Sequence, residues 1–341
     1  MLPALREGVR TLHPGYFALV MATGIVSVAV SGLARVSAAL AWVAGAAYAT
    51  LVALHLLRAV AFRRELARDL SHPARGFAMF TFVAATDVLG ARLAAAGRPG
   101  VAGALLVVGT ASWVVLGYVI PWATFRAAGR PAVAAANGTW FVWVVASQSV
   151  AVLAAAVEPT AERGRRELAL LAVSCWAIGV FLYVAVAGLV AARLVWYEVR
   201  PADITPPYWV AMGAGAITVF AGAGVVQMEQ APALLATRGV IAAVSVLFWA
   251  FASWLLPLLL AVGWWRHVTH RVPLRYEATW WSMVFPLGMY AVASRTLGDA
   301  LELPVVAAIG RAGTWVAAGA WLAVAATMAA HLVRTLSSPP R

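Results

Sequence analysis

Long stretches without a charged residue recur along this sequence, and each is close to the length that a helix needs to cross a lipid bilayer. About 20 apolar residues in a helix span the roughly 30 Å of hydrocarbon. Nine windows are free of acidic and basic residues: 11–34, 36–57, 99–125, 131–157, 168–192, 204–228, 239–265, 278–294 and 312–333. A tenth apolar segment, 76–95, is interrupted by Asp87 and Arg92. Hydrophobic residues make up 63% of the chain and charged residues 11%, a composition that excludes a soluble domain.

These windows predict an all-α polytopic membrane protein with ten transmembrane helices in a single transmembrane domain, residues 1–341. The expected spans are approximately 14–33, 37–62, 76–95, 100–125, 137–157, 167–192, 206–226, 239–265, 278–297 and 306–334. The first span is not interpreted as a signal peptide, because the same kind of segment recurs later in the chain.

The basic residues favour one orientation in the membrane. All 25 of them are arginine, a usage typical of a GC-rich bacterial genome, and they give a formal net charge of +12. Because the arginines lie between the spans, they are topology signals and do not indicate a nucleic-acid partner. The loops after the even-numbered spans, together with both termini, hold 16 of the 25. The positive-inside rule therefore predicts a multi-pass protein of the bacterial inner (plasma) membrane with both termini in the cytoplasm.

The sequence predicts no cofactor and no metal site. The single cysteine, Cys175, lies in an apolar span, which excludes an internal disulfide and a cysteine metal cluster. His267 and His270 have helical spacing, but two ligands are too few for a metal site.

The five odd-numbered spans align without gaps when each is anchored on an aromatic residue near its inner end. The anchors are Phe17, Phe80, Phe141, Tyr208 and Trp281. Four positions later the aligned residues are Met21, Ala84, Val145, Met212 and Phe285. The next columns are small or polar and supply the pore-lining candidates Thr23, Gly24, Thr86, Asp87, Ser147, Gln148, Gly213, Gly215 and Gly288. Because polar groups at mid-membrane depth are costly against lipid, we expect these positions to face protein or water.

The even-numbered spans are apolar nearly all round and end in aromatic and arginine residues typical of the membrane interface. The economical architecture is five helical hairpins around a central pore, with the odd helices as an inner ring and the even helices as an outer ring that faces lipid. Small residues also serve close helix packing, so any one column alone is explained by packing. Five copies at one depth favour a central pathway.

Three stretches carry a resemblance to a known family: HPGYFALVMATGIVS at 13–27, NGTWFVWVVASQS at 137–149 and WWSMVFPLGMYA at 280–291. Over nearly its full length the chain resembles the tellurite-resistance/dicarboxylate transporter family, which includes bacterial TehA, fungal malate and sulfite transporters, and plant slow-type anion channels. The resemblance implies a pore within each protomer and a homotrimer. In this family a phenylalanine on the ninth helix occludes the pore. Phe285 matches that position, and its neighbour Pro286 is expected to break the helix and turn the ring into the pathway.

The function expected from the resemblance is that of an inner-membrane anion channel or transporter for small anions or dicarboxylates. Arg92 and Arg295, at the outer ends of inner helices, form a candidate anion vestibule, although interface anchoring explains each of them alone. The alternative is a proton-coupled dicarboxylate or sulfite carrier on the same fold, which needs a titratable group in its path. A membrane-embedded enzyme would need a cluster of acids, histidines or a nucleophile at one depth, and only Asp87 and Gln148 qualify.

Asp87 itself leaves two arrangements open. It pairs with Arg92 or Arg295, which the rule that buried charges are paired favours, or it is protonated and carries a proton with the substrate.

Overall fold

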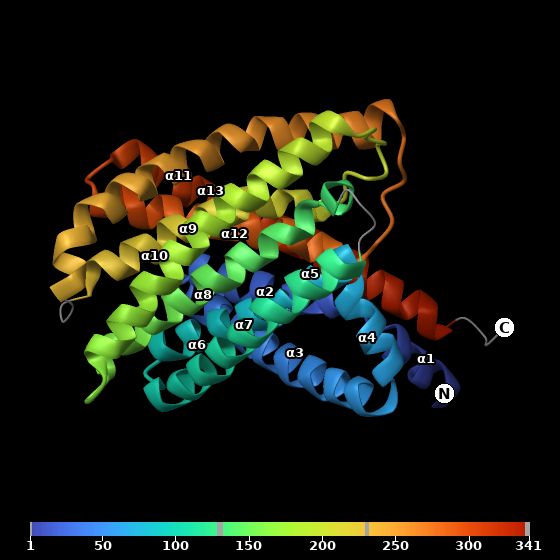
Figure 1. Cartoon of the computed structure of the whole chain (residues 1–341), viewed down its shortest axis with the longest axis horizontal. Coiled ribbons are helices and arrows are strands. Elements are labelled where there is room, and N and C mark those ends of the chain that lie inside the picture. Colours follow the sequence, from blue (N-terminus) through green and yellow to red (C-terminus); the bar gives the residue numbers. More distant parts are fainter. Residues whose placement is uncertain (1, 128–131, 229–231, 338–341) are drawn as a thin grey trace.

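The computed structural model describes residues 2–127, 132–228 and 232–337, and every regular element in these ranges is a helix (Figure 1). The main helices are α2 (Phe17–Ala29), α3 (Ala34–Ala61), α6 (Phe80–Ala95), α7 (Pro99–Ala127), α8 (Phe141–Val157), α9 (Arg165–Trp196), α10 (Val210–Gln227), α11 (Pro232–Trp264), α12 (Trp281–Ala300) and α13 (Pro304–Ser337). Within the described ranges, eight helical segments are long and apolar enough to cross a membrane, and Pro14–Ala29 is a shorter apolar helix. The prediction of an all-α protein with many apolar helices is confirmed.

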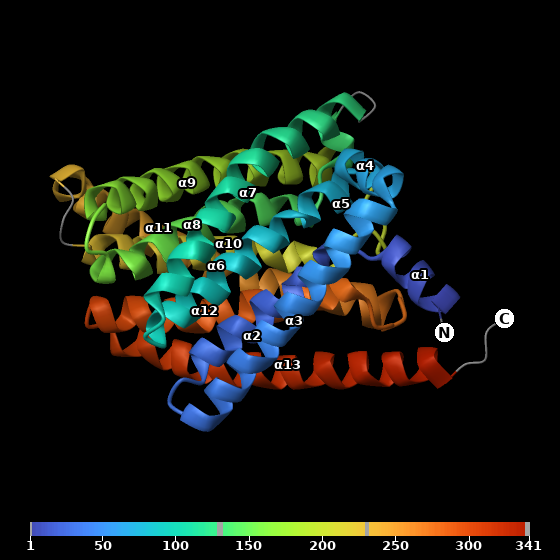
Figure 2. The same ribbon diagram turned by 90° about the horizontal axis from the view of Figure 1, so that it is seen from below.

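The main helices fall into a short and a long class. The short helices α2, α6, α8, α10 and α12 have 13 to 20 residues, and the long helices α3, α7, α9, α11 and α13 have 28 to 34. The short helices pack side by side into a closed ring, in the order α2, α6, α8, α10, α12 and back to α2. Each long helix packs against the short helix that precedes it in the chain, so that the long helices lie on the outside (Figures 1 and 2).

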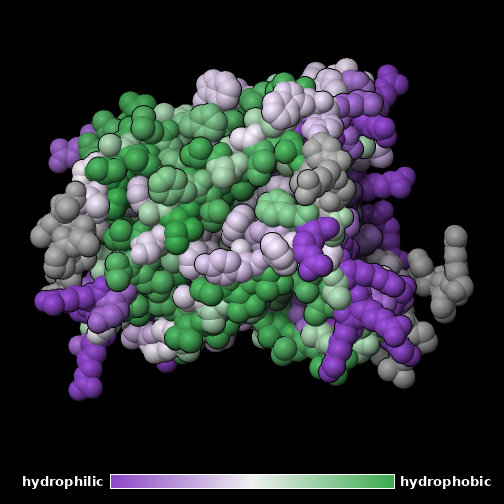
Figure 3. All heavy atoms as spheres, viewed as in Figure 1, coloured by the Kyte–Doolittle hydropathy of each residue, from purple (hydrophilic) through white to green (hydrophobic). Residues whose placement is uncertain are grey.

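Burial separates the two classes. In the most apolar window of the segments that contain α6, α8 and α10, 67–78% of the residues are buried, against 11–39% in the segments of the long helices. Trp42, Phe181 and Trp254 on the long helices are 65–77% exposed. Figure 3 shows this apolar surface around the middle of the molecule, with charged residues at its two ends. The long helices therefore carry much of the exposed apolar surface of the molecule.

Four of the short helices begin in the same way, with a 3₁₀ turn. These turns are Pro14–Tyr16, Gly138–Trp140, Pro206–Trp209 and Ala278–Trp280. His13 Nδ1 accepts the N–H of Gly15 at 3.0 Å, and Asn137 Oδ1 accepts the N–H of Thr139 at 2.9 Å. Such side-chain acceptors satisfy the free N–H groups at a helix start. The sequence repeat of the odd-numbered spans thus has a structural counterpart.

Two shorter helices, α1 (Leu2–Thr11) and α4 (Arg63–Ser71), were not expected from the sequence, and α5 (Pro73–Ala78) overlaps the start of the expected span 76–95. Helix α1 and the C-terminal end of α13 lie at the same end of the molecule (Figures 1 and 2), which we call the inner end. The opposite end is the outer end.

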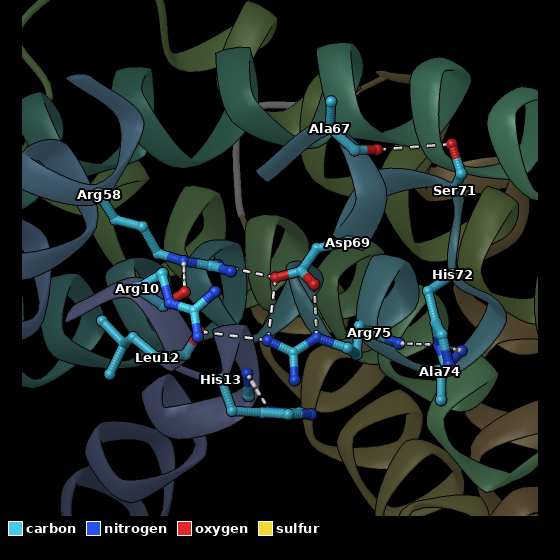
Figure 4. A network of polar contacts seen from close by, with 11 residues as sticks. Arg10, Leu12, His13, Arg58, Ala67, Asp69, Ser71, His72, Ala74 and Arg75 are labelled. Atoms are coloured by element: carbon cyan, nitrogen blue, oxygen red, sulfur yellow. Dashed lines mark hydrogen bonds and ion pairs between the residues drawn. The ribbon is translucent and has the colours of Figure 1, made fainter. Parts of the chain in front are cut away.

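An ion-pair network holds these inner-end helices together (Figure 4). Arg75 Nε donates to Asp69 Oδ1 at 2.5 Å, and Arg58 Nη1 lies 2.7 Å from Asp69 Oδ2. Arg58 Nε also donates to the carbonyl oxygen of Arg10 at 3.1 Å. Burial alone would raise the pKa of Asp69, but the bonds from Arg75 and Arg58 outweigh it and lower that pKa. The network connects α1, α3, α4 and α5 through one carboxylate.

Candidate functional site

A cavity of about 410 Å³ lies on the axis of the ring of short helices, toward the outer end. All five short helices contribute to its wall, each with residues from its C-terminal half. Their C-terminal ends therefore meet at the same end of the molecule, and the short helices run parallel to one another. On each helix, the lining residue nearest the inner end is Ile25 on α2, Val88 on α6, Ser149 on α8, Ile217 on α10 or Met289 on α12.

The wall of the cavity does not include the residues one helical turn further toward the inner end. Side chains four positions apart share a helix face, so the next residues toward the inner end along the same faces are Met21, Ala84, Val145, Gly213 and Phe285, which we call the gate ring. All of them are buried, with Phe285 1% exposed and Met21 3% exposed. The gate ring is apolar, and Phe285 is its single aromatic side chain. The gate ring matches the column of the sequence alignment that contains Phe285, except that Gly213 takes the place of Met212.

Pro286 does not break its helix. Helix α12 runs without interruption from Trp281 to Ala300, with Pro286 in its second turn. The expected break at this position is therefore wrong: the helix continues past the proline, although a proline inside a helix leaves the carbonyl oxygen four residues earlier, that of Ser282, without its usual N–H partner. The pyrrolidine ring packs against α10 instead. A Cβ built on Gly213 would lie 2.8 Å from Pro286 Cγ, so the glycine leaves room for the ring.

The polar pore-lining candidates point away from the cavity, toward the long helices. Thr23 Oγ1 accepts from Trp321 Nε1 at 2.9 Å, and Thr86 Oγ1 lies 2.8 Å from the hydroxyl of Tyr48. On α8, the Ser147 hydroxyl donates to the Cys175 carbonyl oxygen at 2.9 Å. Its neighbour Gln148 donates to the Trp176 carbonyl oxygen at 3.2 Å. These contacts correct the expected role of the four residues, which fasten inner helices to outer ones.

The glycine candidates lie at helix contacts. A Cβ on Gly24 would meet Val88 Cγ1 of α6 at 2.8 Å, and one on Gly288 would meet Ile25 Cγ2 of α2 at the same distance. Gly215 faces Ala252 of the long helix α11. Of the nine candidates, none is in the wall of the cavity. Gly213 is the one that belongs to the gate ring.

Of the two vestibule arginines, Arg92 lines the cavity and Arg295 does not. Arg92 Nε donates to Ser27 Oγ at 3.1 Å, and its Nη2 donates to Ser37 Oγ at 3.3 Å, so two hydroxyl groups hold the guanidinium in place. Arg295 donates instead to the Ala29 carbonyl oxygen at 3.1 Å. The cavity also holds Glu158, whose carboxylate pairs with Arg165 at 2.7 Å.

Asp87 lies directly behind the wall residue Ser149. The Ser149 Oγ is 2.8 Å from Asp87 Oδ2, and the Asp87 side chain is fully buried. The expected ion pair with Arg92 or Arg295 does not form, since both guanidinium groups are bonded elsewhere.

Comparison with known proteins decides the family. Residues 11–329 match the family model described as "Voltage-dependent anion channel", named SLAC1. The chain belongs to this family. Over 319 residues it is 23% identical to an uncharacterized transporter of Methanocaldococcus jannaschii. The alignment covers 90% of this chain and 89% of that protein. A second transporter of that organism is 22% identical over 330 residues, 93% of this chain and 94% of the relative.

A further relative matches about half of the chain. It is an uncharacterized membrane protein of Mycobacterium tuberculosis, 56% identical over 161 residues, which are 47% of this chain and 82% of that protein. The resemblance seen in the sequence is confirmed, and membership of the voltage-dependent anion channel family makes the chain a membrane protein of an anion channel and transporter family.

The wall of the cavity contains residues that the sequence analysis did not select, among them Ser149, Ile217, Phe220 and Met289. A signal for them was present. They lie four residues, or seven for Phe220, after the gate-ring residue of the same helix, and so on the same helix face. On α10 this spacing requires Gly213 in place of the aligned Met212.

Proposed function

We propose that this protein conducts small anions across the bacterial inner membrane through a pathway on the axis of the five short helices. In this proposal the five hairpins of short and long helices give ten transmembrane helices, with both termini in the cytoplasm. The structure is then a closed state, in which the gate ring separates the outer cavity from the inner end, with Phe285 as the plug.

The observation that carries the proposal is the cavity itself. It is lined by all five short helices, and its innermost lining residue on α12, Met289, lies one helical turn from the buried Phe285. An apolar constriction of this kind blocks ions, because an ion that enters it loses its hydration without gaining polar partners. Removal or rotation of one bulky ring would open the path.

Charge in the cavity favours anions over cations. Arg92 contributes a guanidinium whose bonding partners among the described residues are neutral hydroxyl groups, so they do not cancel its positive charge. The carboxylate of Glu158 is neutralised by Arg165. A positive potential in a narrow space with low-dielectric walls concentrates anions at the mouth of a pore. Inorganic anions and short dicarboxylates both suit such a site.

We also propose that the protein is a homotrimer with one pathway in each protomer. This rests on the family resemblance, and light scattering of the purified protein tests it through the mass of the assembly. A mass equal to one chain would exclude the trimer.

The test of the gate is Phe285→Ala. The variant, reconstituted in liposomes, should raise the flux of chloride, nitrate, sulfite or malate about tenfold or more, which corresponds to removing roughly 1.4 kcal/mol of barrier. Truncation of a buried phenylalanine also destabilises a protein by about 3–5 kcal/mol, so the thermal stability of the variant has to be measured alongside the flux.

A matched control is Phe77→Ala. Phe77 is also buried, but it lies on α5, outside the ring of short helices, and its ring stacks against Trp140 with 4.8 Å between the centroids. The control should lose comparable stability and leave the flux low. A folded Phe285→Ala variant with the wild-type flux, or equal flux in both variants, would exclude Phe285 as the plug.

A further inference from the structure

The fully buried carboxyl group of Asp87 has no part in the pathway described so far. It comes from α6, and it is separated from the cavity by the side chain of Ser149, which forms part of the cavity wall. A single side chain, that of Ser149, therefore separates Asp87 from water in the cavity.

The hydrogen bonds around Ser149 fix where a proton must be. Ser149 Oγ lies 2.8 Å from Asp87 Oδ2 and also 2.8 Å from the Ala146 carbonyl oxygen. A hydroxyl group has one proton, and a carbonyl oxygen only accepts. Both short contacts are satisfied together when Asp87 is a carboxylic acid. Its O–H then donates to Ser149 Oγ, and Ser149 donates to the Ala146 carbonyl oxygen.

The second carboxyl oxygen supports the same arrangement. Asp87 Oδ1 is buried and has no hydrogen-bond partner among the described residues. It lies against Gly109 of α7, so close that a Cβ at that position would collide with it. A carboxylate oxygen held against a glycine without a donor would carry a large desolvation penalty, whereas the carbonyl oxygen of a neutral acid tolerates this contact far better.

Within the described ranges, no cation compensates the charge that an ionised Asp87 would have. Arg92, five residues further along α6, is bonded to Ser27 and Ser37. Helices α2 and α8 contain no ionisable residue, and those of α7 are Tyr118 and Arg126, at least nine positions from Gly109. On α3, Tyr48 bonds the neighbouring Thr86, while Arg35, His55 and Arg58 lie two or more turns away from it. The remaining ionisable group near Asp87 is the thiol of Cys175 on α9, which carries no positive charge in any protonation state.

We propose that Asp87 is a proton-binding site of the transport pathway, which holds its proton in this closed conformation and exchanges it with the cavity through Ser149. The inference rests on the proposed function and adds a second ligand to it. The proton comes from water in the cavity, and its arrival converts the carboxylate into a neutral acid. The Ser149 hydroxyl, which can donate to a carboxylate at Asp87, then accepts from the acid and donates to the Ala146 carbonyl oxygen. A neutral Asp87 does not repel an anion held near Arg92. Binding of a proton at Asp87 therefore favours binding of an anion in the cavity, and binding of the anion favours binding of the proton.

The first experiment is Asp87→Asn in liposomes, best made on the Phe285→Ala background so that flux is measurable. Asparagine has the shape of the protonated acid, and its NH₂ group donates to Ser149 as the acid would. Flux in the Phe285→Ala parent should fall as the pH on the outer side is raised, and Asp87→Asn should give the same flux at low and high pH. The variant should also melt close to its parent, because no charge is lost from the fold.

The second experiment detects the proton directly. The infrared spectrum of the purified wild-type protein should contain the C=O stretching band of a protonated carboxyl group, and Asp87→Asn should remove it. Ser149→Ala should shift this band, because the Asp87 O–H loses its acceptor. Glu167→Gln is the control. It removes an exposed carboxylate near the start of α9 that does not line the cavity, so it should leave both the band and the pH profile unchanged.

The outcomes separate the two proposals. A carboxyl band that persists in Asp87→Asn, or that Ser149→Ala does not shift, overturns the proton site. An unchanged pH profile in Asp87→Asn overturns its link to transport. Failure of Phe285→Ala to raise the flux overturns the pathway, and the infrared result then still reports whether Asp87 carries a proton.

Discussion

Arg92 combines two properties that rarely occur together in one side chain of a membrane protein. Its guanidinium lines a cavity, and its hydrogen-bond acceptors there are the neutral hydroxyl groups of Ser27 and Ser37. Those two serines also bond to each other's backbone across the α2–α3 turn, at 2.7 and 2.8 Å. The C-terminal end of α2 and the N-terminal end of α3 therefore hold the charge of Arg92 at a fixed place in the cavity wall.

Arg92→Gln should weaken anion uptake into the cavity. The loss of one charge near an aqueous site changes the interaction energy by about 1 kcal/mol, which is roughly a fivefold rise in the half-saturating anion concentration. Flux at saturating anion should change less. Arg98→Gln is the control, because Arg98 is exposed at the same end and does not line the cavity. Equal effects of the two variants would mean that Arg92 acts only through general surface charge.

Pro286 of α12 packs closely against Gly213 of the gate ring. A Cβ at 213 would lie 2.8 Å from Pro286 Cγ and 3.1 Å from its Cα, so the backbone of α12 would have to move. Overpacking of this kind costs about 1–3 kcal/mol. We expect Gly213→Ala to lower the melting temperature and to raise the basal anion flux by displacing Phe285. A stable variant with unchanged flux would show that α12 adjusts without moving the plug.

At the scale of the helices, the inner-end network should make the fold sensitive to acid. Burial, with the charge of Arg75 nearby, lowers the pKa of His13 to about 4. A histidine in the unfolded chain binds its proton near pH 6.5, so the unfolded state gains protons first and stability falls as the pH drops from about 6.5 to 4. The pKa of Asp69 is also lowered, so its contribution is present above the unfolded value of about 3.9 and is lost below it.

The measurement is the melting temperature of the detergent-solubilised protein from about pH 7.5 down to about pH 4, which covers the titration of His13 and approaches that of Asp69. Wild-type protein should lose stability steadily across this range. Asp69→Asn should be less stable at neutral pH by about 3 kcal/mol, since it leaves the buried Arg58 without its counter-charge. A flat profile in the wild type over this range would mean that the fold does not hold His13 in its neutral form.

Most helices of this protein could be predicted from the sequence, because each apolar window is free of charge and about as long as a helix that spans a membrane. The gate ring was almost predictable too. Its exception, Gly213, arises because α10 begins at Val210 after a longer 3₁₀ turn, whereas the other short helices begin at their aromatic anchors. The register of α10 is thereby shifted by one residue.

The polar columns were assigned to the wrong face for a geometric reason. Thr23, Thr86 and Ser147 follow the gate ring by two positions, and two residues turn a helix by about 200°. They therefore point to the outer helices, while Gly24 and Gly288, three positions on, point to the neighbouring helices of the ring. The sequence allows an estimate of how deep a residue lies in the membrane. The direction in which its side chain points depends on which face of its helix is turned toward the centre of the ring, and the sequence alone does not give that face. The helices α1 and α4 were missed because they lie outside the apolar windows.

At the scale of the whole molecule, the orientation in the membrane is open to a direct test. The natural cysteine, Cys175, is 1% exposed, so a membrane-impermeant maleimide should leave the wild type unlabelled. Glu162→Cys, in the exposed loop after α8, should be labelled in intact cells, and Arg64→Cys, on the exposed face of α4, only after the membrane is broken. The reverse pattern would overturn the orientation that the arginines predict.

The position of the cavity also determines how a voltage acts on this protein. In the proposed orientation the cavity brings outside solution down to the gate ring, so the membrane potential drops over the closed part of the pathway, from that ring to the inner end, and not over the full thickness of the bilayer. An anion that has reached Arg92 has crossed little of the field, and the step past Phe285 crosses most of it, at about 2.3 kcal/mol per unit charge for each 100 mV. Binding in the vestibule should thus be nearly independent of voltage, while passage through the plug should depend on it steeply.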